Sequence, residues 1–232
     1  MAGGPGALTL RRAAALALLL LLPSASEAGP GPLTAPPSTY RPVVVDGFTF
    51  PVARTSWLSV IEFDDDWHAP RMRLIGGRWQ QVGVHEGLDI TAEPGTPVLS
   101  MSAGRVEALG WTFYSGNRVG VRGDDGRYYF YAHLSSFADL GVGSRVGPGT
   151  PLGRVGNTGY GPPGHTDEFP PHLHVGIRAA DWVSPYPLVS RLYRRAVRAT
   201  SRGEARLTAL ARRGDRVGFE RLAARLYADL RP

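Results

Sequence analysis

The stretch PPHLHVGI, residues 170–177, places two histidines one residue apart in a chain of 232 residues that contains only 6 histidines. Prolines precede the pair and an apolar run follows it, a setting that suits a strand. In a strand, residues two apart point to the same face, roughly 6.6–6.8 Å apart along the chain. The imidazoles of His172 and His174 are therefore predicted to face one common space.

The segments around this pair read as short strands separated by turns, from about residue 43 to residue 187. NRVGVRG and RYYFYAHL flank Asp125 and Gly126, and Asp-Gly is a strong hairpin signal. The 30 glycines and 20 prolines favour turns, and no part of this region sustains a period of 3.6 residues. We therefore expect a mainly β domain of antiparallel strands over residues 43–187.

Residues 188–232 have a different character. Apolar residues recur there at helical spacing in two stretches, and 12 arginines stand against 4 acidic residues from residue 185 onward. We expect a C-terminal extension of amphipathic helices with arginine-rich outer faces. Their apolar stripes would pack on the β domain or on each other; alternatively, the arginines would bind anionic wall polymers or lipid head groups. No nucleic acid is expected as a partner.

Residues 1–28 have the layout of a secretory signal peptide. Two arginines precede an apolar run at 13–22, which is about half the ~20 residues that a membrane span needs. Small residues then fit a cleavage site after residue 28. An uncleaved membrane anchor is the alternative. Residues 29–42 are rich in proline and predict an extended linker. We expect a protein exported to the periplasm, cell envelope or exterior of a bacterium.

The chain contains no cysteine. An exported domain without disulfides must be held together by its core or by a metal ion. The absence also excludes a thiol nucleophile and thiolate ligands for zinc. A zinc ion would therefore have to be bound by histidine and carboxylate groups.

Two further motifs carry histidines: HEGLD, which begins at His85, and YAHL, which contains His133. Zinc in hydrolases usually takes three ligands from His and Asp or Glu and leaves the fourth position for water. His85, Asp89 and one histidine of the HLH pair supply such a set. The remaining histidine of the pair and His133 are left to hydrogen-bond the metal-bound water or a developing oxyanion.

HEGLD, YAHL, GRVGNTG and HLH, in this order, resemble the motifs of the lysostaphin/LytM-type zinc endopeptidases of bacterial cell walls. The resemblance extends over about residues 50–187 and includes the segment IEFDDDWHAPRM before HEGLD. It implies a lysostaphin-type fold built on a duplicated hybrid motif: an antiparallel β-sheet groove with the metal on its floor and loops as its walls. The glycines of VGNTG would shape a tight turn near the site.

The resemblance also implies a role for each residue of the site. His85, Asp89 and His174 would bind one zinc ion per chain. His133 and His172 would transfer protons and orient the water, whose pKa zinc lowers toward ~7. The implied function is an exported zinc metalloendopeptidase that hydrolyses peptide bonds in peptidoglycan cross-links. The alternatives are a non-catalytic LytM-type regulator of a cell-wall amidase and a wall-binding module with a vestigial site.

Other residues receive lesser roles. Trp79, in the variable segment before HEGLD, is a candidate for assisting an oxyanion. His165 and Asp167 are interpreted as rim residues of a groove wall, and His68 as a structural residue beside the groove.

Overall fold

The computed structural model describes residues 42–53 and 60–226. The expected signal peptide and all but the last residue of the expected linker lie outside this part of the chain. Among the described residues, no helix combines the length and the apolar character that a membrane crossing requires.

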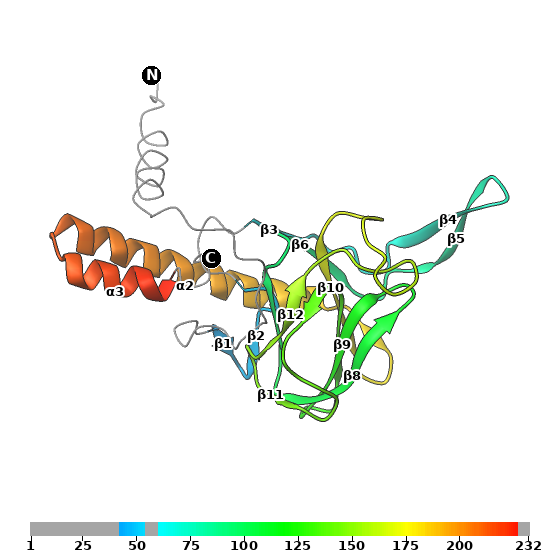
Figure 1. Cartoon of the computed structure of the whole chain (residues 1–232), viewed down its shortest axis with the longest axis horizontal. Helices are drawn as coiled ribbons and strands as arrows, with labels where there is room; N and C mark the ends of the chain where they lie inside the picture. Colours follow the sequence, from blue (N-terminus) through cyan, green and yellow to red (C-terminus); the bar gives the residue numbers. More distant parts are fainter. Residues whose placement is uncertain (1–41, 54–59, 227–232) are drawn as a thin grey trace, which may run out of the picture. The chain divides into compact units, whose positions relative to one another are not determined.

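A ten-stranded antiparallel sheet forms the body of the protein (Figure 1). Its strands are β3 (Ile61–Glu62), β6 (Leu88–Ala92), β7 (Pro97–Leu99), β8 (Gly104–Thr112), β9 (Gly116–Gly123), β10 (Tyr128–Phe137), β11 (Arg145–Val146), β12 (Pro151–Val155), β13 (His172–Arg178) and β14 (Trp182–Val183). The main path runs in the order β11-β8-β9-β10-β13-β6-β3, while β12 joins β10 to β7 and β14 pairs with β13. The expectation of a mainly antiparallel β fold is confirmed.

Two small ribbons accompany the main sheet. One pairs β1 (Val44–Val45) with β2 (Phe48–Thr49), and the other pairs β4 (Pro70–Ile75) with β5 (Arg78–Val84). Gly76 and Gly77 join β4 to β5 with φ values of +57° and +76°, which suit glycine. Every residue of β5 is exposed, so this ribbon is packed far less than the sheet.

The hairpin predicted at Asp125 and Gly126 is present. Strands β9 and β10 pair up to Arg122 and Tyr128, and Gly126 takes a φ of +81° in the turn between them. The backbone N–H of Gly126 donates to the carbonyl of Gly123 at 3.0 Å. The conformational freedom of glycine thus sets the register of these two strands.

Strand β13 separates an apolar face from a polar one. Leu173, Val175 and Ile177 are buried in the core, each contributing roughly 1.5–3 kcal/mol relative to exposure. His172 and His174 alternate with them and therefore point to the opposite face. The prediction that the two imidazoles share a face is confirmed.

The C-terminal extension consists, within the described residues, of α2 (Tyr186–Arg212) and α3 (Arg216–Leu226). Pro187 lies in the first turn of α2, where its missing N–H costs no hydrogen bond. Val189 and Leu192 of this helix are buried in the same core as the sheet residues. The apolar stripe at the start of α2 therefore packs on the β domain, and the helix begins two residues before the predicted boundary.

We expect Leu192→Ala to destabilise the protein by about 2–5 kcal/mol, because the side chain is 1% exposed and its removal leaves a cavity. Urea unfolding of the purified protein measures this change. Arg195→Ala, on an exposed position of the same helix, is the control and should change stability by less than about 0.5 kcal/mol. Equal stability of the two variants would show that α2 is not part of the core.

Candidate metal centre

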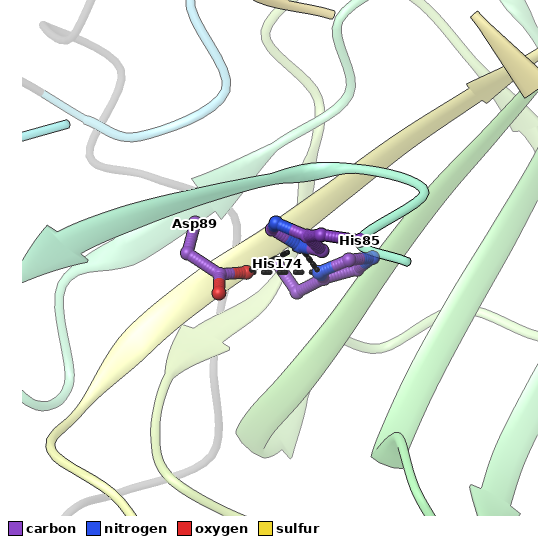
Figure 2. A group of neighbouring side chains, drawn as sticks. All are labelled: His85, Asp89 and His174. Carbon is purple, nitrogen blue, oxygen red and sulfur yellow. Dashed lines mark hydrogen bonds and ion pairs between the residues drawn. The ribbon is translucent and has the colours of Figure 1, made fainter. Parts of the chain in front are cut away.

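Three side chains turn one ligand atom each to a common point: His85, Asp89 and His174 (Figure 2). The Oδ1 atom of Asp89 lies 2.9 Å from Nδ1 of His174 and 3.2 Å from Nε2 of His85. The two nitrogen atoms are 3.0 Å apart. The structure therefore brings together the three residues that the sequence suggested as ligands.

The register of two neighbouring strands positions two of these three residues. Strands β6 and β13 pair so that Asp89 stands directly opposite His174. Opposite residues in an antiparallel pair have Cβ atoms about 4.5–5.5 Å apart, close enough for their side chains to converge. His85 reaches the same point from the loop just before β6, where its backbone exchanges hydrogen bonds of 2.9 Å with His68 and Ala69.

Gly87, the glycine of HEGLD, makes room for this arrangement. A Cβ atom at this position would lie 2.3 Å from Cε1 of His174 and 2.8 Å from the carbonyl oxygen of Val175. Both distances are shorter than real carbon contacts, so any side chain would push His174 away from Asp89. The glycine is therefore needed for close approach and not for a special backbone angle.

The three ligand atoms fit one face of a tetrahedral zinc site. Zinc–ligand bonds of about 2.0–2.1 Å place neighbouring ligand atoms about 3.3–3.4 Å apart. The separations in this site, 2.9, 3.0 and 3.2 Å, are only slightly shorter. Two imidazoles and a carboxylate are also a usual donor set of zinc hydrolases. The chain thus contains a metal-binding triad whose chemistry suits zinc.

Hydrogen bonds and burial shift the ionisation of all three groups. Burial alone would raise the pKa of Asp89, but hydrogen bonds from His174 and His85 hold it well below its usual range. Burial opposes the charged form of His85, yet its bonds to Asp66 and Asp89 raise its pKa to about 9. Burial lowers the pKa of His174. The centre therefore keeps a permanent carboxylate charge that attracts a cation.

Asp66 is a functional candidate that the sequence did not single out. Its Oδ2 atom lies 2.9 Å from Nδ1 of His85, and its backbone carbonyl lies 3.3 Å from the same nitrogen. A proton held on Nδ1 leaves the lone pair of Nε2 free for a metal. Three consecutive aspartates, 64–66, precede the motif, and the sequence offers no means of choosing among them.

His133 reaches the site through an irregularity in β10. Its φ is +65°, and the pairing of β10 with β9 shifts register between Tyr131 and Leu134. Such bulges redirect a side chain out of the regular alternation and are frequent beside active sites. The Nδ1–H of His133 donates to the carbonyl of Thr158 in VGNTG at 2.7 Å, and its ring centre lies 4.8 Å from that of His172.

The protonation of the two non-ligand imidazoles follows from their surroundings. Burial, reinforced by the charge of His172, lowers the pKa of His133 to about 3. His133 is therefore neutral at neutral pH, with its Nδ1 proton held by Thr158. His172 likewise directs Nδ1 to the carbonyl of Pro170 at 2.9 Å, while its Nε2 lies 3.7 Å from Oδ1 of Asp89. Both imidazoles thus present Nε2 as the atom available for proton transfer.

The lesser candidates lie outside this cluster. His165 and Asp167 bond to Glu168 at 2.9 Å and Asn157 at 2.8 Å, as rim residues would. Trp79 is 68% exposed on β5, in a ribbon outside the main sheet. Phe169 was not anticipated; its ring centre lies 4.6 Å from that of His133 and 4.9 Å from that of His172.

We expect Gly87→Ala to lose most of its affinity for zinc while remaining folded, because the added methyl group displaces His174. Isothermal titration calorimetry of the metal-free protein with Zn²⁺ measures the affinity for zinc, and circular dichroism monitors the fold. Gly83→Ala is the matched control and should bind zinc normally, since a methyl group added there would meet no atom within 4 Å. Unchanged affinity in Gly87→Ala would exclude the steric role.

Comparisons with known proteins agree with this geometry. Residues 83–185 match peptidase family M23. The chain is 44% identical over 121 residues to an L-Ala--D-Glu endopeptidase of Bacillus subtilis, a stretch that covers 50% of this chain and 36% of the relative. It is 37% identical over 94 residues to lysostaphin of Staphylococcus simulans, which covers 40% of this chain and 17% of the relative.

A solved structure named for a glycyl-glycine endopeptidase LytM of Ruminococcus gnavus has the same fold. It superposes with a TM-score of 0.53 at 35% identity, over 67% of this chain and 62% of that one. This chain spans about a third of the length of the Bacillus relative, so the likeness concerns the domain that holds the metal centre. Residues 83–185, with their intact His-Asp-His triad, thus form a domain that matches peptidase family M23 and is similar to lysostaphin- and LytM-type endopeptidases.

Proposed function

We propose that this protein is an exported zinc metalloendopeptidase that hydrolyses peptide bonds in peptidoglycan. The observation that carries the proposal is the convergence of a His-Asp-His triad and two further imidazoles on one face of the sheet. Two of the proteins named above support it, since their names are those of an L-Ala--D-Glu endopeptidase and a glycyl-glycine endopeptidase. The match to the family of these endopeptidases also supports a location of this protein outside the cytoplasm.

The ligand residues and Asp66 have separate roles in the reaction. When bound, zinc lowers the pKa of water to about 7 and polarises a carbonyl group. His85, Asp89 and His174 hold the ion, and Asp66 keeps the proton of His85 on the nitrogen that faces away from it. No side-chain nucleophile is then required, in keeping with the absence of cysteine from the chain.

His133 and His172 carry out proton transfer and charge stabilisation during hydrolysis. The Nδ1–H of His133 is fixed by Thr158, which leaves Nε2 to accept a proton from the attacking water. His172, fixed through Pro170 and adjacent to Asp89, stabilises the charge that develops on the carbonyl oxygen, and the proton taken up by His133 passes to the leaving amine. The ring of Phe169 shields both imidazoles on one side.

Two parts of the chain extend this proposal. The layout of residues 1–28 supports export by a signal peptide. The arginines of α2 at 194, 195, 198 and 202 are exposed and form no ion pair with any described residue, which supports contact with anionic wall polymers or lipid head groups. The amidase regulator is not favoured, because all five site residues are retained.

We expect His174→Ala to lose both bound zinc and the release of peptides from purified peptidoglycan, because the substitution removes one of three ligands. Elemental analysis of the purified protein and mass spectrometry of the released fragments measure the two effects. His165→Ala is the matched control and should retain both, since its imidazole bonds to Glu168 at the rim. Undiminished hydrolysis by His174→Ala would rule out this centre as the active site.

His133→Asn should behave differently from His174→Ala. Asparagine tolerates a positive φ such as the +65° at this position, so the fold and the zinc content are expected to persist. The kcat for peptide hydrolysis should fall by about 10²–10⁴-fold, the usual contribution of a general base. Steady-state kinetics at matched zinc occupancy test this, and a kcat within a factor of two of the wild-type value would assign the base elsewhere.

A further inference from the structure

The hairpin of β4 and β5 has two unlike faces. Side chains at alternate positions of a strand share a face, and the pairing of Arg73 with Gln80 and of Ile75 with Arg78 carries that alternation into β5. One face, here called the arginine face, consists of Arg71, Arg73, Ile75, Arg78 and Gln80. The opposite face carries Met72, Leu74 and Trp79, each about half exposed or more.

Two contacts show that the arginine face is turned toward the metal centre. The Nη2 atom of Arg71 lies 3.3 Å from Oδ2 of Asp89, the oxygen that does not face the two histidines. The guanidinium of Arg73 lies 5.4 Å from the centre of the Tyr114 ring, in the turn between β8 and β9. These contacts place Arg71 and Arg73 on the side of the hairpin that faces the main sheet.

Arg71 and Arg73 differ in whether their guanidinium groups are already paired with a carboxylate. Arg71 is paired with Asp89. Arg73 is exposed and forms no ion pair with any residue that the structure describes. A guanidinium stacked on an aromatic ring keeps the N–H groups at its edge available, in the fork that matches a carboxylate. Residues 70–84 contain no acidic residue that would compete for them.

The position of Arg73 on β4 determines how far a substrate group bound to it lies from the bond that is cut. Arg73 follows Arg71 by two residues, which is roughly 6.6–6.8 Å along the strand, and Arg71 itself touches the metal-ligand carboxylate. An extended substrate advances by about 3.3–3.4 Å per residue. A group held by Arg73 therefore belongs to a substrate residue about two positions or fewer from the bond that is cut.

We propose that Arg73 binds a carboxylate of the substrate peptide, which makes this enzyme selective for acidic peptides over neutral glycine bridges. The inference rests on the proposed endopeptidase function and specifies its substrate class. A guanidinium–carboxylate pair is charge-assisted and bidentate, so it distinguishes a carboxylate from the amide of equal size. A glycine bridge offers no side chain and gains nothing from Arg73.

Three synthetic substrates test the proposal with the zinc-loaded full chain. The first is a peptidoglycan stem peptide L-Ala–γ-D-Glu–L-Lys–D-Ala with a free α-carboxyl group on D-Glu and an amidated C-terminus. The second differs only in the amidation of that α-carboxyl group, and the third is pentaglycine. We expect kcat/KM to be about tenfold higher for the acid than for its amide, which corresponds to about 1.4 kcal/mol, and lowest for pentaglycine.

Variants then assign the selectivity to one side chain. Arg73→Gln should bring the acid-to-amide ratio of kcat/KM close to one, mainly through a higher KM for the acid, whereas Arg73→Lys should keep part of it. Met72→Gln, on the opposite face of the same strand, is the matched control and should keep the wild-type ratio. Zinc content is measured for every variant and is expected to be unchanged.

The outcomes separate this inference from the function on which it rests. Equal rates for acid and amide in the wild-type protein would overturn the inference while leaving the endopeptidase in place. An unchanged ratio in Arg73→Gln, or an equal loss in Met72→Gln, would overturn the assignment to Arg73. Failure of the wild-type protein to cut any of the three peptides or whole peptidoglycan would instead refute the endopeptidase function and the inference together.

Discussion

The contact between Asp89 and His174 across strands β6 and β13 is the constraint on which the site depends. The two residues stand opposite each other in the ladder, with 2.9 Å between oxygen and nitrogen. A slip of one residue in this pairing would exchange the faces of β13, bringing Leu173 to the centre and both histidines into the core. The burial of the apolar face of β13 therefore fixes the register and, through it, the metal centre.

Around this contact, the protein balances charges that would be costly to bury alone. A carboxylate among imidazoles is tolerable only when each lone pair and proton has a partner. Arg71 occupies the outer oxygen of Asp89, and Asp66 occupies the outer nitrogen of His85. Both partners come from the segment that precedes HEGLD in the sequence, so this segment, which belongs to no strand of the main sheet, completes the surroundings of the ligands.

Much of this arrangement could be predicted from the sequence because it depends on local rules. Strand alternation predicted the common face of His172 and His174, and the Asp-Gly turn predicted the β9–β10 hairpin. The resemblance placed His133 at the site, but the bulge that turns it inward could not be predicted, since it arises only when β10 pairs with β9. The contacts of Asp66 and Arg71 could not be predicted either, because their partners lie 18 or more residues away in the chain.

The central place of β13 in the sheet has a consequence for biosynthesis. This strand lies between β10 and β6 and supplies both HLH histidines, yet it is the last long strand to be made. A growing chain that has not reached residue 172 lacks two of the five imidazole and carboxylate groups of the site. It also lacks the strand that pairs with both β10 and β6. Contacts between residues as far apart as 85 positions also close slowly. The metal centre thus assembles only on a finished domain.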